Sequence, residues 1–236
     1  MARQRTFLTA EWKNLLMLNY AVDPALLQGY VPAGTELDQF DGKTYVSLIG
    51  FEFNKTRVLG TAIPFHQSFE EVNLRSYVRR LERRGVVFIS ELVPKYAVAA
   101  IARFVYGERY SCAKMTHYIE KSGGRTTAEF SWGSGSGRGM ISAETVGDSY
   151  LPREGSLSQF ITEHYWGYAA QRTGRTLEYQ VEHPQWKVRD AKQAQFTGNA
   201  GKYYGAQFAE VLERTPDSAF LAEGSAVTVF KGVPIE

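Results

Sequence analysis

The sequence predicts an α+β fold in which many β-strands form a barrel-like sheet and three helices lie beside it. Aromatic residues make up 14% of the chain, and aromatic side chains suit the half-buried, pleated surface of a sheet. Glycines recur where turns between strands are expected. Apolar and polar residues alternate along 69–79, which is the period of a strand with two different faces. No shift of composition marks a linker, so we expect one domain over residues 1–236.

Turn signals separate the expected strands. Asp41-Gly42 predicts a tight hairpin, and Gly123-Gly124 predicts a second one. The residues between these turns are rich in aromatic and β-branched side chains. The expected strands cover residues 12–20, 37–40, 44–53, 69–79, 85–93, 110–120, 125–132, 140–146, 175–182, 186–197 and 225–231.

Three helices are expected between these strands. Residues 95–106 carry apolar side chains at helical spacing. Ser156 is a suitable cap for a second helix over 157–172, and a third fits 202–213. A shorter helix is expected to follow Asp23-Pro24, where a capping carboxylate precedes a proline at the first helical position.

Composition excludes several classes of protein. With 27 basic against 25 acidic residues, the net charge of +2 favours no nucleic-acid partner, and the arginines that follow Tyr77 fit a solvated hairpin tip. One cysteine excludes a disulfide framework, and the four histidines lack the spacing of a zinc site, so we expect no metal and no cofactor. No apolar run reaches the about 18 residues of a membrane helix. We therefore expect a soluble cytoplasmic domain with no membrane partner.

The strand at 69–79 carries the first candidate site. Glu71, Asn73, Arg75 and Tyr77 share one face of this strand. They would form a recognition wall if they point inward, and Arg75 would then grip a carboxylate with two hydrogen bonds. Alternatively, they form a solvated outer face with ion pairs between neighbouring strands. The sequence alone leaves both interpretations open.

Two further residues suit catalysis. Glu91 lies in an otherwise apolar run, and burial of a carboxylate favours its protonated form, as a general acid or base requires. Lys114 lies among aromatic and small residues, where a desolvated amine becomes nucleophilic toward carbonyl groups. The alternatives are an ion pair for Glu91 and an exposed strand edge for Lys114. His183, which precedes Pro184, is a candidate ligand contact or a structural hydrogen-bonding group.

Four segments carry a family resemblance: FLTAEWKNLLMLNYAVDPALLQGYVPAGTELDQFDGKTYVSLIGF at 7–51, IPFHQSFEEVNLRSYVR at 63–79, GVVFISELVP at 85–94 and YQVEHPQW at 179–186. Together they resemble the YqjF-like family of uncharacterised bacterial proteins, which is grouped with the acetoacetate decarboxylase-like superfamily. The resemblance implies a single α+β domain around a closed or conical antiparallel β-barrel with an internal cavity. It implies no established reaction.

The acetoacetate decarboxylases themselves use two adjacent lysines, a glutamate and an arginine. In the corresponding region Lys114 is flanked by Ala113 and Met115, so the second lysine is missing. The positions of the arginine and the glutamate fall near Tyr20 and Val58. The resemblance therefore argues against authentic decarboxylation and leaves lysine-based (Schiff-base) chemistry with Lys114 alone, and it makes Tyr20 a candidate ligand contact.

The combined expectation is an internal cavity that binds a small anionic or carbonyl metabolite. Arg75 with Asn73 and Glu71 would orient the ligand, and Glu91 and Lys114 would act in a lyase or hydratase type of carbonyl chemistry. The alternatives are a non-catalytic ligand-binding or regulatory module on the same fold, and an interaction protein without a small ligand. Assembly into homo-oligomers is left open.

Overall fold

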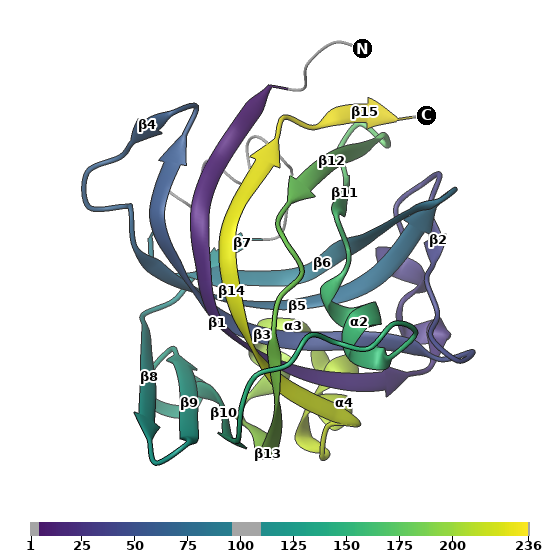
Figure 1. Cartoon of the computed structure of the whole chain (residues 1–236). Helices are drawn as coiled ribbons and strands as arrows, with labels where there is room; N and C mark the ends of the chain where they lie inside the picture. The colour runs from purple at the N-terminus through teal and green to yellow at the C-terminus, as the bar shows by residue number, and fades with distance from the viewer. Residues whose placement is uncertain (1–4, 96–109, 236) are drawn as a thin grey trace.

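The computed structural model describes residues 5–95 and 110–235. Within these residues the fold is dominated by one mixed sheet, with few helices (Figure 1). Its strands are β1 (Thr6–Val22), β2 (Glu36–Leu37), β3 (Thr44–Val58), β4 (Thr61–Ala62), β5 (Phe69–Arg80), β6 (Arg83–Val93), β7 (Tyr110–Cys112), β8 (Met115–Ser122), β9 (Arg125–Trp132), β10 (Gly139–Val146), β11 (Trp166–Ala170), β12 (Thr176–Glu182), β13 (Val188–Gly198), β14 (Ser218–Phe230) and β15 (Val233–Ile235). The helices are α2 (Leu157–Thr162), α3 (Ala200–Tyr204) and α4 (Ala209–Glu213).

The strand pairing follows a path that returns to its start. Hydrogen bonds link β12 through β11, β6, β5, β3 and β1 to β14, and β14 pairs again with β12 at Val181 and Val229. We call these seven strands the strand circuit. A second set of strands, β13, β10, β9 and β8, branches from the N-terminal half of β14. The long, curved strands β1, β3 and β14 run through the whole molecule (Figure 1).

The expectation of an antiparallel sheet holds for most strand pairs but not for all. β6 pairs in parallel with both β7 and β11. The remaining pairs are antiparallel, because most neighbours in the sheet are connected by hairpins or returning loops. The sheet is therefore mixed.

Apolar residues form two large clusters on opposite faces of the same strands. The first, which we call the packed core, includes Leu16, Leu48, Leu74 and Phe130 and continues into α3 and α4. The second, which we call the cavity-side cluster, includes Leu15, Ile49, Phe51, Tyr77 and Phe160 of α2. Neighbouring residues on a strand point to opposite faces. Both faces of β1 are buried, which explains the unbroken apolar run from Leu15 to Leu18.

Several expected helices differ from the structure. The helix expected at 157–172 ends at Thr162, and strand β11 follows from Trp166. Gly167 of β11 lies so close to the Tyr179 ring of β12 that an added Cβ would come within 2.1 Å of it, so strand pairing overrides the local helical pattern. No helix among residues 5–95 and 110–235 is long and apolar enough to cross a membrane.

The other helical and strand expectations are corrected in a similar way. The helix expected at 202–213 is divided into α3, a 3-10 turn and α4, with the break at Gly205, which has a φ of 95°. The short helix expected from Asp23-Pro24 to about Tyr30 consists of two 3-10 turns, Pro24–Leu26 and Gln28–Tyr30, and Asp23 caps the first of them. The strand expected at 110–120 is interrupted between β7 and β8. The helix expected at 95–106 lies outside the described residues apart from its first position.

Candidate functional site

Residues of the strand circuit, of α2 and of neighbouring segments line a cavity of about 140 Å³. Cavities of about 150 Å³ bind molecules of the size of benzene. Its walls are largely apolar and include many aromatic rings, and Trp12 packs edge-on against Phe51, Phe53 and Trp186 at centroid distances of 5.4, 5.7 and 6.1 Å. The cavity is therefore large enough for a small organic molecule and apolar over most of its surface.

The polar face of β5 points into this cavity. Glu71 and Asn73 are only 3% and 2% exposed, and both line the cavity together with Arg75. The interpretation of this face as a solvated surface is wrong, because the opposite face of β5 packs into the core while this face borders the hollow. Of the four residues of this face, Glu71, Asn73 and Arg75 line the cavity and Tyr77 does not, and recognition of a ligand by them stays a prediction.

Glu91 joins this wall from β6. It lies opposite Asn73 in the pairing of β5 with β6, is 1% exposed and lines the cavity. The register shifts between Leu74 and Arg75, so that Ile89 becomes an extra residue on β6. A bulge of this kind re-aims side chains. It brings Glu91 to the same side of β6 as Phe88. On a regular strand, two residues three positions apart would point to opposite faces.

Hydrogen bonds fix part of the wall and leave part of it without a partner. Glu71 accepts hydrogen bonds from Asn73 Nδ2 at 2.9 Å and from the Tyr110 hydroxyl at 3.4 Å. Arg75 donates from one terminal nitrogen to the carbonyl of Ile161 at 3.0 Å. Arg75 Nε and Asn73 Oδ1 are buried and have no partner among the described residues. Unsatisfied buried polar atoms of this kind are costly, so they indicate a place for a polar ligand or water.

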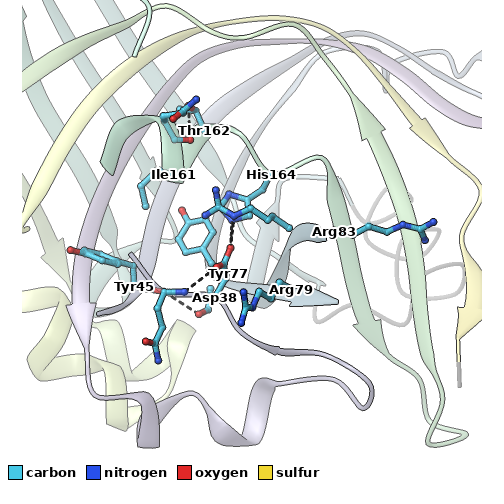
Figure 2. Close-up of polar contacts among 12 residues, drawn as sticks. Asp38, Tyr45, Tyr77, Arg79, Arg83, Ile161, Thr162 and His164 are labelled. Carbon is cyan, nitrogen blue, oxygen red and sulfur yellow. Dashed lines mark hydrogen bonds and ion pairs between the residues drawn. The ribbon is translucent and has the colours of Figure 1, made fainter. Parts of the chain in front are cut away.

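A second polar group includes His164, which follows the end of α2 and lines the same cavity. Asp38 Oδ2 accepts hydrogen bonds from Arg84 Nε at 2.7 Å and from His164 Nε2 at 3.4 Å. Figure 2 shows His164 and Asp38 joined beside the Tyr77 ring, whose centroid lies 4.6 Å from that of the imidazole. Arg84, expected at a solvated hairpin tip, thus reaches inward to a buried carboxylate.

The charges of this group follow from burial and pairing. Burial, together with the neighbouring charges of Arg84 and Arg75, lowers the pKa of the His164 imidazole to about 4, so the ring is neutral at pH 7. Burial opposes ionisation of Asp38, yet the hydrogen bonds from His164 and Arg84 bring the pKa of its carboxyl below the usual value. No local pattern marked His164 as a site residue, because the expected helix continued past it.

The other sequence candidates fall in different places. His183 lines the cavity, stacks on Trp186 at 4.1 Å and has a pKa lowered to about 4 by burial. Its Nδ1 lies 2.9 Å from the Pro184 carbonyl, so this nitrogen carries the proton of the neutral ring. His183 therefore acts as a structural hydrogen-bonding group at the cavity wall, and its role as a ligand contact stays a prediction.

Tyr20 and Lys114 do not line the cavity. Tyr20 shares the packed-core face of β1 with Leu16 and Leu18, where burial raises the pKa of its phenol. Lys114 is exposed in the interruption between β7 and β8, where the alternation of a continuous strand no longer applies. The described residues that line the cavity include no lysine.

A family model described as an uncharacterized conserved protein, DUF2071, matches residues 9–226. The chain belongs to this family. This DUF2071 protein is also 26% identical over 191 residues to the uncharacterized protein YqjF of Bacillus subtilis (strain 168), with 77% of this chain and 74% of YqjF covered. The expected YqjF-like resemblance is confirmed.

Solved structures show which fold the DUF2071 protein shares. Acetoacetate decarboxylase from Legionella pneumophila superposes with a TM-score of 0.71 at 14% identity, with coverage of 98% of this chain and 87% of that chain. The enduracididine biosynthesis enzyme MppR complexed with pyruvate superposes with a TM-score of 0.70 at 14% identity, with coverage of 100% and 92%. An acetoacetate decarboxylase-like enzyme from Sphingomonas wittichii RW1 superposes at 0.67 and 13%, with coverage of 97% and 93%. At these identities the likeness shows the fold alone.

Proposed function

We propose that this DUF2071 protein binds a small carbonyl compound with a carboxylate group inside the strand circuit, which acts as a closed barrel around the cavity. The observation that supports this most is a pair of buried atoms without a described partner, Arg75 Nε and Asn73 Oδ1, in a cavity whose lining is mostly apolar. They offer a hydrogen-bond donor and an acceptor side by side on β5. We further propose that the chain forms one domain and acts in the cytoplasm.

Arg75 supplies the charge for this recognition. Among the described residues that line the cavity, it is the only arginine or lysine. Its bond to the Ile161 carbonyl fixes the guanidinium plane and leaves the Nε edge for a ligand. A guanidinium pairs with a carboxylate through two parallel hydrogen bonds, and this attraction is stronger in a surrounding of low dielectric constant. The aromatic walls then hold the apolar part of the ligand.

The proposed chemistry is acid–base catalysis without a covalent lysine intermediate. Glu91 faces Asn73 across the strand pair and lines the cavity beside Phe88, so it is positioned for proton exchange with a ligand bound at Arg75. A lyase or hydratase type of reaction needs such a group. The second candidate, binding without turnover, is favoured by the absence of lysine among the described lining residues. The MppR enzyme, which shares this fold, is complexed with pyruvate in its solved structure, and this supports 2-oxo acids as first test ligands.

Calorimetric titration with pyruvate, 2-oxobutyrate and phenylpyruvate tests the binding proposal, with butanone as an uncharged comparison. We expect Arg75→Gln to weaken binding of the acids by about 10- to 100-fold, the usual worth of a hydrogen bond to a charged group. Arg79→Gln is the matched control, because Arg79 lies on the same strand but is exposed and pairs with Glu36. Equal affinities for the parent and Arg75→Gln, or binding of butanone alone, would contradict the anchor.

A further inference from the structure

His164 occupies a position from which a side chain can reach the ligand. It follows the end of α2 at Thr162, its side chain is 1% exposed, and it lines the cavity together with Arg75. The Tyr77 ring packs against it at 4.6 Å, and Phe160 packs edge-on at 5.2 Å. Two aromatic rings and one hydrogen bond thus hold the imidazole in one orientation.

The hydrogen bond to Asp38 determines which imidazole nitrogen can accept a proton. Asp38 is ionised and can only accept, so the neutral ring carries its proton on Nε2. The other nitrogen, Nδ1, therefore presents a lone pair. It is buried and has no partner among the described residues. A carboxylate that fixes the tautomer of an adjacent histidine is the arrangement found in many general bases.

We propose that His164 Nδ1 is the general base of the cavity and removes a proton from the carbon next to the carbonyl of a 2-oxo acid. The C–H bond breaks, the proton passes to Nδ1, and the electron pair becomes that of an enolate. Arg75 stabilises the enolate oxygen, and Asp38 stabilises the imidazolium that forms. Reprotonation at the same carbon restores the acid, so no further reactant is needed. This inference rests on the proposed function.

The surrounding charges couple this base to ligand binding. Among the residues that the structure describes, three charged groups act on His164: Asp38 from the loop after β2, Arg84 from β6 and Arg75 from β5. The two arginines disfavour the imidazolium, and Asp38 favours it. A carboxylate bound at Arg75 offsets one of the two positive charges. The proton affinity of His164 therefore rises when a ligand binds. Without a ligand, the imidazole stays unprotonated at neutral pH and can accept a proton.

The first experiment measures exchange of the carbon-bound protons of 2-oxobutyrate in deuterated water by proton NMR, with ligand binding measured separately by calorimetry. We expect His164→Gln to bind the acid but to lower the exchange rate by at least about 100-fold. His117→Gln is the control, because His117 lies outside the cavity and pairs with Glu52 and Glu70. We expect this control to exchange at the parent rate.

Rescue and tautomer measurements separate a chemical role from a structural one. Imidazole added to His164→Ala should restore exchange at least tenfold, and nitrogen NMR of the parent should show Nδ1 without a proton. A protonated Nδ1 in the parent, or full exchange in His164→Gln, overturns this inference. A parent that binds the acid without exchanging it also overturns the inference and leaves the proposed function standing. A parent that does not bind 2-oxo acids overturns both.

Discussion

The packed core and the cavity side are built from the same strands, but they differ in how completely they are filled. Leu16 and Leu74 face the packed core, while their neighbours Leu15 and Arg75 line the cavity. On the packed side, a Cβ added to Gly50 would come within 2.7 Å of the Phe130 ring. On the cavity side, the side chains do not fill the space between the strands and leave a cavity of about 140 Å³.

This difference indicates that the two faces of the strands have different roles, one in stability and the other in ligand binding. Close-packed apolar contacts stabilise the folded protein, and the side chains around a cavity of this size lack some of these contacts. Of the buried polar atoms without a described partner, those of Trp12, Thr56, Asn73, Arg75 and His164 belong to the cavity lining, whereas those of Trp132 and Tyr204 lie on the packed side. Substitutions on the packed side should therefore affect the free energy of unfolding, and those on the cavity side should affect ligand binding or the response to pH.

Phe130→Ala should show the largest effect of the packed side. Phe130 is fully buried, its ring lies against the Gly50 position of β3, and the His117 ring stacks on it at a centroid distance of 5.9 Å. We expect a loss of about 3–5 kcal/mol in the free energy of unfolding, measured by urea denaturation. A loss below about 1 kcal/mol, which is the usual scale of an ordinary substitution, would show that this side is not close-packed.

Acidification should lower the stability of the folded protein because His164, on the cavity side, is buried in its neutral form. His164 has a pKa of about 4 in the folded protein and about 6.5 in an unfolded chain, so the unfolded chain binds more protons between these values. Stability is therefore fully present above pH 6.5 and falls as the pH drops toward 4, by on the order of 3 kcal/mol from this residue.

The comparison variant for this pH dependence is His164→Gln. Its stability should depend less on pH between 6.5 and 4 than that of the parent, as measured by urea denaturation at a series of pH values. Part of the pH dependence should remain in this variant because of His183, whose pKa is also lowered to about 4. Parallel pH curves for the parent and the variant would show that His164 takes up its proton without cost in the folded protein.

The sequence predicted the fold better than it predicted the site, and particular residues show why. Alternation along 69–79 placed Glu71, Asn73 and Arg75 on one face correctly. It could not tell whether that face meets solvent or a hollow, because both faces of this central strand are buried by elements distant in the sequence. The helical pattern at 157–172 concealed His164, because pairing of β11 with β6 and β12, rather than local propensity, ends the helix.

The position of Lys114 depended on a feature that no local pattern shows. An uninterrupted strand over 110–120 would have kept it on one face with Tyr110, whose hydroxyl reaches Glu71. The break between β7 and β8 removes that constraint, and the Gly133 N–H donates to the Lys114 carbonyl instead. The family resemblance identified the fold from the same residues.

Lys114→Ala should produce the smallest effect. The side chain is exposed and does not line the cavity, so we expect a change in the free energy of unfolding within about 0.5 kcal/mol and unchanged affinity for 2-oxo acids. Borohydride added to the parent in the presence of pyruvate should give no adduct by intact mass, because Lys114 lies outside the cavity in which we propose that the acid binds. An adduct that is lost in Lys114→Ala would instead identify Lys114 as a covalent catalyst, and the cavity side would then need a second conformation in which residues 113–114 turn inward.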